Sequence, residues 1–158
     1  MLFLIEKMNY KFDISLKNRN ILNAFFEKCS LEELNKIPEG FNNNVIWNIA
    51  HVVVTQQLLV YDMSGLPMLI REELVEKYRK GTKADRDVTQ NDVDEIKSLI
   101  FSTIEQTKHD YKNGVFKEYN AYTTSTNSSI KNVDEAMAFN NFHEGIHLGY
   151  ILALKRLL

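Results

Sequence analysis

The chain has 158 residues, 44% of them hydrophobic and 25% charged, which is ordinary for one globular domain with its own core. A net charge of −2 and the lack of a basic run exclude the electrostatic pattern typical of nucleic-acid-binding proteins. The single cysteine excludes an internal disulfide framework and indicates the cytoplasm. No apolar run approaches the roughly 20 residues that a membrane span needs. We therefore expect one domain over residues 1–158, with neither a nucleic-acid nor a membrane partner.

Long helices are favoured over short strands, because only six glycines and two prolines interrupt the chain. The first long helix is predicted over about residues 14–28, with Asp13 as its N-cap. A short helical turn is predicted after Ser30, where Glu33 completes a capping box.

Three more long helices follow. The second is predicted from residue 43 or 44 to about 63, and it is apolar nearly all round, which implies deep burial. A minor helix is expected over about residues 71–80. The third long helix is predicted over about residues 90–113, and the fourth over 133–158. Four long helices in one domain predict an all-α four-helix bundle.

The fourth helix contains H-E-G-I-H at residues 143–147, which matches the two-histidine zinc motif H-E-x-x-H. Residues four apart lie on one helical face, about 40° apart. The stripe that holds both histidines is otherwise apolar and is predicted to face the core: Ala136, Phe139, His143, Ile146, His147, Tyr150 and Leu154. A lone core histidine is most often simply hydrogen-bonded. Two buried imidazoles need two sets of partners, and one metal ion can satisfy both.

The other two histidines are predicted to face opposite ways. His51 shares its face of the second helix with Trp47 and Leu58, so it should point inward. His109 lies on the far side of the third helix from the core residue Ile100 and should be exposed. Three inward histidines with an open fourth position are typical of a catalytic metal site rather than a closed structural one.

A metalloprotease is not indicated, although the motif is shared. Such enzymes normally take a third protein ligand from further along the chain, and no residue after His147 is His, Asp, Glu or Cys. The chain also shows no convincing strand that would bind a peptide.

Glu144 lies on the border of the histidine stripe, and three interpretations stay open. It can be a carboxylate on the helix surface. It can instead be a hydrogen-bond partner of a ligand imidazole, or a general base beside metal-bound water.

Two separate motifs carry a family resemblance. N-N-N-V-I-W-N-I-A-H, residues 42–51, resembles the Asn-rich start, tryptophan and ligand histidine of the DinB superfamily. F-H-E-G-I-H-L-G-Y-I-L-A-L-K-R-L-L, residues 142–158, is similar to its last helix, and the Gly81-Thr82 pair also fits. The resemblance covers roughly residues 14–158.

The resemblance implies an up-down-down-up four-helix bundle that is often a homodimer. It also implies a divalent metal ion, commonly zinc or nickel, held by His51, His143 and His147. Some members resemble metal-dependent transferases that activate a low-molecular-weight thiol such as bacillithiol, mycothiol or glutathione, and many have no known activity. Relatives often carry Gln where this chain has Tyr150, whose hydroxyl can face the open metal position or whose ring can fill the core.

The leading hypothesis is a metal-dependent enzyme that transfers a low-molecular-weight thiol to a small electrophile, or hydrolyses a small substrate. Glu144 and Tyr150 are its candidate catalytic residues. The alternative is a non-catalytic dimeric stress-response or binding module whose metal is structural or incidental. A third hypothesis has three core histidines and no metal, but each unsatisfied imidazole would then destabilise the fold by about 1–3 kcal/mol.

Overall fold

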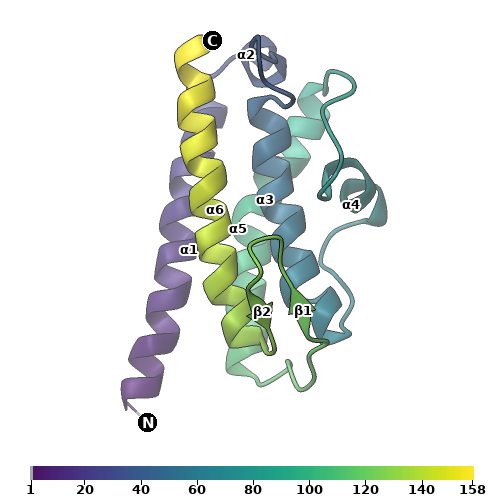
Figure 1. The fold of residues 1–158 in the computed structure, drawn as a ribbon. Helices are drawn as coiled ribbons and strands as arrows, with labels where there is room; N and C mark the ends of the chain where they lie inside the picture. Colours follow the sequence, from purple (N-terminus) through teal and green to yellow (C-terminus); the bar gives the residue numbers. More distant parts are fainter. Residues whose placement is uncertain (1) are drawn as a thin grey trace.

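Four long helices pack side by side in the computed structural model, which describes residues 2–158 and the side chains from residue 10 onward (Figure 1). They are α1 (Leu2–Lys28), α3 (Val45–Val60), α5 (Gln90–Lys112) and α6 (Val133–Leu154). Both α5 and α6 pack against α1 and against α3. The predicted all-α fold is confirmed. None of the helices in the described residues has the length and apolarity that crossing a membrane requires.

Short elements connect the long helices. They are α2 (Leu31–Asn35), the 3₁₀ turn η1 (Asp62–Ser64), α4 (Glu72–Tyr78), strands β1 (Tyr122–Thr123) and β2 (Ser129–Ile130), and the 3₁₀ turn η2 (Lys155–Leu157). The two strands pair antiparallel as a small ribbon that the sequence did not predict. The predicted fourth helix ends at Leu154 and continues only as η2.

The first helix begins earlier than predicted. Because no glycine or proline occurs before Lys28, nothing interrupts α1, and Asp13 lies inside it rather than capping it. Asp13 instead pairs with Lys17 one turn later, 2.6 Å away. The predicted capping box is confirmed: Ser30 Oγ accepts from the Glu33 N–H, and Glu33 Oε2 accepts from the Ser30 N–H.

The helix α3 lies at the centre of the core. Every residue of it except Thr55 and Leu58 is buried, as its nearly uniform apolar sequence predicted. Asn44 caps its start by accepting from the Trp47 N–H at 2.9 Å, and Gly65, with φ of +67°, ends the turn that follows it. A helix that is buried on almost every side therefore carries His51.

Candidate metal centre

Three histidines from two helices meet in the bundle. One ring nitrogen from each of His51 on α3 and His143 and His147 on α6 lies within 4.8 Å of the others. The ring centroids are 4.5 to 5.1 Å apart. These three residues are called the histidine cluster below. The predicted convergence of the three histidines is confirmed, and His109 is exposed on α5 as predicted.

Hydrogen bonds orient two of the three imidazoles. His51 Nδ1 lies 2.6 Å from the backbone oxygen of Tyr78, which can only accept, so this nitrogen carries the proton. His147 Nδ1 lies 2.8 Å from Asn48 Oδ1. The amide of Asn48 is oriented by its own donation to the Asn44 carbonyl, so its oxygen accepts from His147. Both rings therefore keep an Nε2 lone pair, which is how metal-ligating histidines are commonly held.

The third imidazole has an unsatisfied nitrogen. His143 Nδ1 is buried and has no hydrogen-bond partner among the described residues. Buried polar atoms are almost always hydrogen-bonded, so such an atom needs an explanation. A divalent ion between the three rings, or a water bound there, would supply one. The donor set of three imidazoles suits zinc and nickel.

The electrostatics of the histidine cluster favour neutral rings. Burial, followed by the neighbouring His147, His51 and Arg19, lowers the pKa of His143 to about 3. Burial and the nearby His51 lower the pKa of His147 to about 4. Burial also lowers the pKa of His51. All three imidazoles are thus uncharged at neutral pH, which is the state that binds a metal.

The prediction of which α6 residues face the core is wrong in part. Ile146 and Tyr150 are 50% and 37% exposed, whereas Asn140 and Glu144 are buried. The buried face is therefore turned toward Glu144, and His143 and His147 lie at its edge, half-buried. The physical reason is the buried Arg19 on α1, which provides a partner for a carboxylate where the pattern indicated only hydrocarbon.

Of the three interpretations that the sequence left open for Glu144, the position on the helix surface is wrong. Glu144 and Arg19 are both fully buried, and Glu144 Oε1 accepts from Arg19 Nε at 3.0 Å and Nη2 at 2.7 Å. Asn140 Nδ2 donates to the same oxygen at 2.9 Å. Glu144 directly follows His143 on α6, so this ion pair lies beside the histidine cluster, and the charge of Arg19 contributes to lowering the pKa of His143. The role of Glu144 as a general base or as a hydrogen-bond partner of an imidazole stays a prediction.

Tyr150 contacts Phe41 rather than the core. The two rings meet edge to face with centroids 5.4 Å apart. In the part of the chain that the structure describes, no hydrogen bond joins its hydroxyl to the histidine cluster. Its predicted catalytic role likewise stays a prediction.

Sequence reasoning missed three residues that support the histidine cluster. Asn48 accepts a hydrogen bond from His147, and the Tyr78 carbonyl accepts one from His51. Arg19 donates to Glu144. Asn48 had a usable signal, since it is a polar residue in the middle of an apolar helix, one turn before His51. Tyr78 acts through its backbone, and Arg19 lies 125 residues from its partner, so neither leaves a local pattern.

An all-α bundle with three histidines converging from α3 and α6 defines a class of helical proteins equipped to bind a divalent metal. Within that class, the sequence profile of the DinB superfamily matches residues 16–151, and the chain belongs to this superfamily. A comparison with curated proteins finds none that matches this chain. The resemblance carried by the two sequence motifs is thereby confirmed.

Breaking the buried ion pair should destabilise the fold strongly. We expect Arg19→Met to lower the free energy of unfolding by about 3–5 kcal/mol, because it leaves Glu144 buried without its partner. The double variant Arg19→Met/Glu144→Met removes both charges and should recover most of that loss. Urea unfolding followed by circular dichroism measures both. Additive losses in the double variant would contradict the pairing.

The metal-free protein should lose stability in acid between about pH 6.5 and 4. Unfolded histidines bind protons near pH 6.5, whereas the folded His143 and His147 resist protonation until about pH 3 and 4, so the unfolded state gains protons first. Each such histidine adds at most about 1.4 kcal/mol per pH unit. We expect a shallower slope in chelator-treated His143→Gln than in wild type, measured by urea unfolding at several pH values. Equal slopes would refute the lowered pKa.

Proposed function

We propose that this protein is a metal-dependent enzyme that activates a low-molecular-weight thiol, or water, for attack on a small electrophile. His51, His143 and His147 would hold one zinc or nickel ion. The observation that carries the proposal is the convergence of three neutral imidazoles from two helices. Three protein ligands leave a coordination position free, as catalytic sites do.

When bound, a divalent ion supplies Lewis acidity, which deprotonates a coordinated thiol or lowers the pKa of a bound water to about 7. The chain supplies the orientation. The Tyr78 carbonyl and the Asn48 amide fix two rings, and Trp47 stacks on His51 with ring planes 12° apart. His143 and His147 are only half-buried, so small molecules can approach the cluster from their side.

The two catalytic candidates take different proposed roles. Glu144 is best suited to positioning α6, because its carboxylate is buried and one oxygen already accepts three hydrogen bonds. Its other oxygen, Oε2, is buried and has no hydrogen-bond partner among the described residues. Tyr150 is proposed to border the entrance to the histidine cluster from the exposed side of α6.

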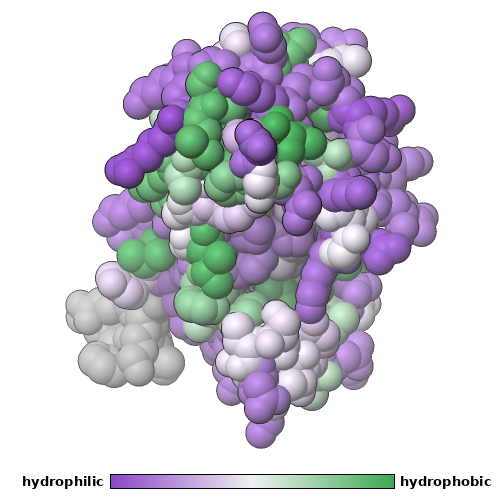
Figure 2. All heavy atoms as spheres, turned by 45° about the horizontal axis from the view of Figure 1, so that its top comes forward, coloured by the Kyte–Doolittle hydropathy of each residue, from purple (hydrophilic) through white to green (hydrophobic). Residues whose placement is uncertain are grey.

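We further propose an up-down-down-up arrangement of the four long helices in one domain, in a cytoplasmic homodimer. The positions of the chain ends in Figure 1 support the topology, and the single reduced Cys29 supports the compartment. Figure 2 shows hydrophobic side chains exposed in patches among hydrophilic ones. On α6, Phe142, Ile146 and Leu152 are each at least 50% exposed, which favours contact with a second copy.

Metal content tests the proposed site. Protein purified without an affinity tag should carry about one equivalent of zinc or nickel by plasma mass spectrometry, and His51→Ala, His143→Ala and His147→Ala should each lose it. His109→Ala is the matched control, because His109 is exposed, and it should retain the metal. Wild-type protein that stays metal-free after loading with either ion would contradict the proposal.

Turnover tests the proposed chemistry. Metal-loaded protein should conjugate at least one of bacillithiol, mycothiol and glutathione to a chloro-aromatic or epoxide acceptor, and chelation should abolish the reaction. His147→Ala should lower the rate by about a hundredfold or more. Metal binding without conjugation by any thiol and without hydrolysis would instead support the alternative, a binding module with a structural metal.

The dimer has its own test. Analytical ultracentrifugation should give twice the 18.4 kDa mass of the chain, and Leu152→Glu should shift the protein to monomer because it places charge in the apolar contact. Lys108→Glu on α5 is the control and should leave the mass unchanged. A monomeric wild type would refute the homodimer.

A further inference from the structure

A hydroxyl group lies directly beside the histidine cluster. Thr55 follows His51 by one turn of α3, so the two side chains lie on one face of the helix. Thr55 Oγ1 is 3.3 Å from His51 Nε2, which is the nitrogen left for a metal ion because Nδ1 bonds to the Tyr78 carbonyl. Thr55 is half-buried, as are His143 and His147, so small molecules can approach this part of the site from solvent.

The hydroxyl group of Thr55 is the donor in this contact. A neutral imidazole carries one N–H, and in His51 it is on Nδ1, because the Tyr78 carbonyl 2.6 Å away can only accept. His51 Nε2 therefore presents a lone pair, and only the Thr55 hydroxyl can supply the hydrogen between the two atoms. The separation of 3.3 Å is long for a hydroxyl donor, so the bond is weak and a better acceptor can replace it.

Thr55 differs in this respect from the buried threonines of α5. A threonine inside a helix can donate to the carbonyl four residues earlier. Thr103 does so to Leu99, and Thr107 does so to Thr103, both at 2.7 Å. Among the described residues, Thr55 makes no such bond to a carbonyl and instead donates to His51. Its hydrogen is therefore directed at the metal-binding side of His51 rather than at its own helix.

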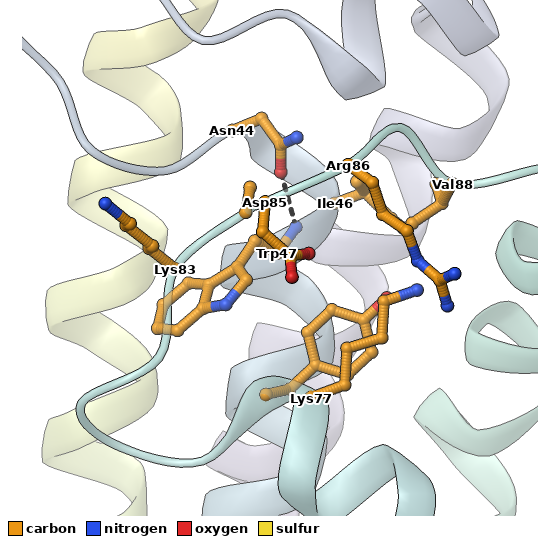
Figure 3. Close-up of a pocket in the computed structure, with 10 residues that line it drawn as sticks. Asn44, Ile46, Trp47, Lys77, Lys83, Asp85, Arg86 and Val88 are labelled. Carbon is orange, nitrogen blue, oxygen red and sulfur yellow. Dashed lines mark hydrogen bonds between the residues drawn. The ribbon is translucent and has the colours of Figure 1, made fainter.

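The ring of His51 is held by two other contacts. The Tyr78 carbonyl accepts from Nδ1, and Trp47 stacks on the ring with centroids 4.7 Å apart. Trp47 belongs to the first turn of α3, where its backbone N–H donates to the Asn44 side chain, as the dashed line in Figure 3 shows. Because the ring is fixed in this way, a metal ion on Nε2 would leave the Thr55 hydroxyl, and not the ring, to find a new partner.

We propose that Thr55 binds the thiol substrate, with its hydroxyl group donating to the thiolate sulfur once His51 Nε2 holds the metal ion. The inference rests on the proposed function. Hydrogen bonds to an anion are stronger than those between neutral groups, so the thiolate is a better acceptor than the ring nitrogen that it replaces. Thr55 keeps its proton throughout, and it stabilises and orients the sulfur without transferring a group.

Cobalt(II) makes thiol binding visible, because imidazole ligands suit it as they suit zinc and because a cobalt–thiolate bond absorbs in the near ultraviolet. Cobalt-loaded full-length protein should bind 2-mercaptoethanol saturably at constant pH. Thr55→Val keeps the shape of the side chain but lacks the hydroxyl group, so it should load cobalt and bind the thiol about tenfold more weakly. Thr55→Ser retains the hydroxyl group and should restore most of the affinity. Equal thiol affinity in wild type and Thr55→Val, or equally weak binding in Thr55→Ser and Thr55→Val, would overturn the proposal.

A matched control separates thiol binding from a general effect on the fold. Thr103→Val removes a hydroxyl group that bonds within α5, and it should leave the affinity for 2-mercaptoethanol unchanged. An equal weakening in Thr103→Val, or loss of cobalt from Thr55→Val, would also overturn the proposal.

The cobalt content distinguishes this inference from the function on which it rests. Wild-type protein that takes up no cobalt refutes the proposed metal site, and the role of Thr55 with it. Cobalt-loaded wild type that binds no thiol refutes thiol activation. Cobalt-loaded wild type that binds the thiol no better than Thr55→Val refutes the role of Thr55 alone.

Discussion

The structure depends on burying polar groups between α3, α6 and α1 without leaving them charged and unpaired. Isolated charges are costly inside a protein, so buried ionisable groups either pair or become neutral. Both solutions occur side by side here. Arg19 and Glu144 form an ion pair, and the neighbouring His143 is kept neutral, with a pKa of about 3. The ion pair and the histidine cluster thus form one polar layer in an otherwise apolar bundle.

This polar layer sets the rotation of α6 about its own axis. Because Glu144 reaches Arg19, the buried face of α6 is centred near Asn140 and Glu144, and the two α6 histidines lie at its edge. They can then meet His51 from α3 and still be partly open to solvent. Had the apolar stripe alone set the rotation, His143 and His147 would be deeply buried and closed to a substrate.

Much of the fold and the centre of the site could be predicted from local patterns. Helical spacing turned His51, His143 and His147 inward and His109 outward, and the capping box of Ser30 and Glu33 lies where the sequence indicated. The pattern failed where a distant residue decides the outcome. No residue near Glu144 in the sequence indicates that Arg19 is its partner. The buried face of α6 was therefore predicted to lie too close to Ile146. The start of α1 was missed for a different reason, because Asp13 is a good cap in isolation but the chain before it also forms helix.

The central claim is that the three imidazoles together hold one divalent ion with a position left open. X-ray absorption spectroscopy on zinc-loaded protein tests it most directly. The account predicts three imidazole nitrogens at about 2.0–2.1 Å and at least one further light ligand from solvent. A shell with fewer than three imidazoles, or with sulfur from Cys29 at about 2.3 Å, would contradict it.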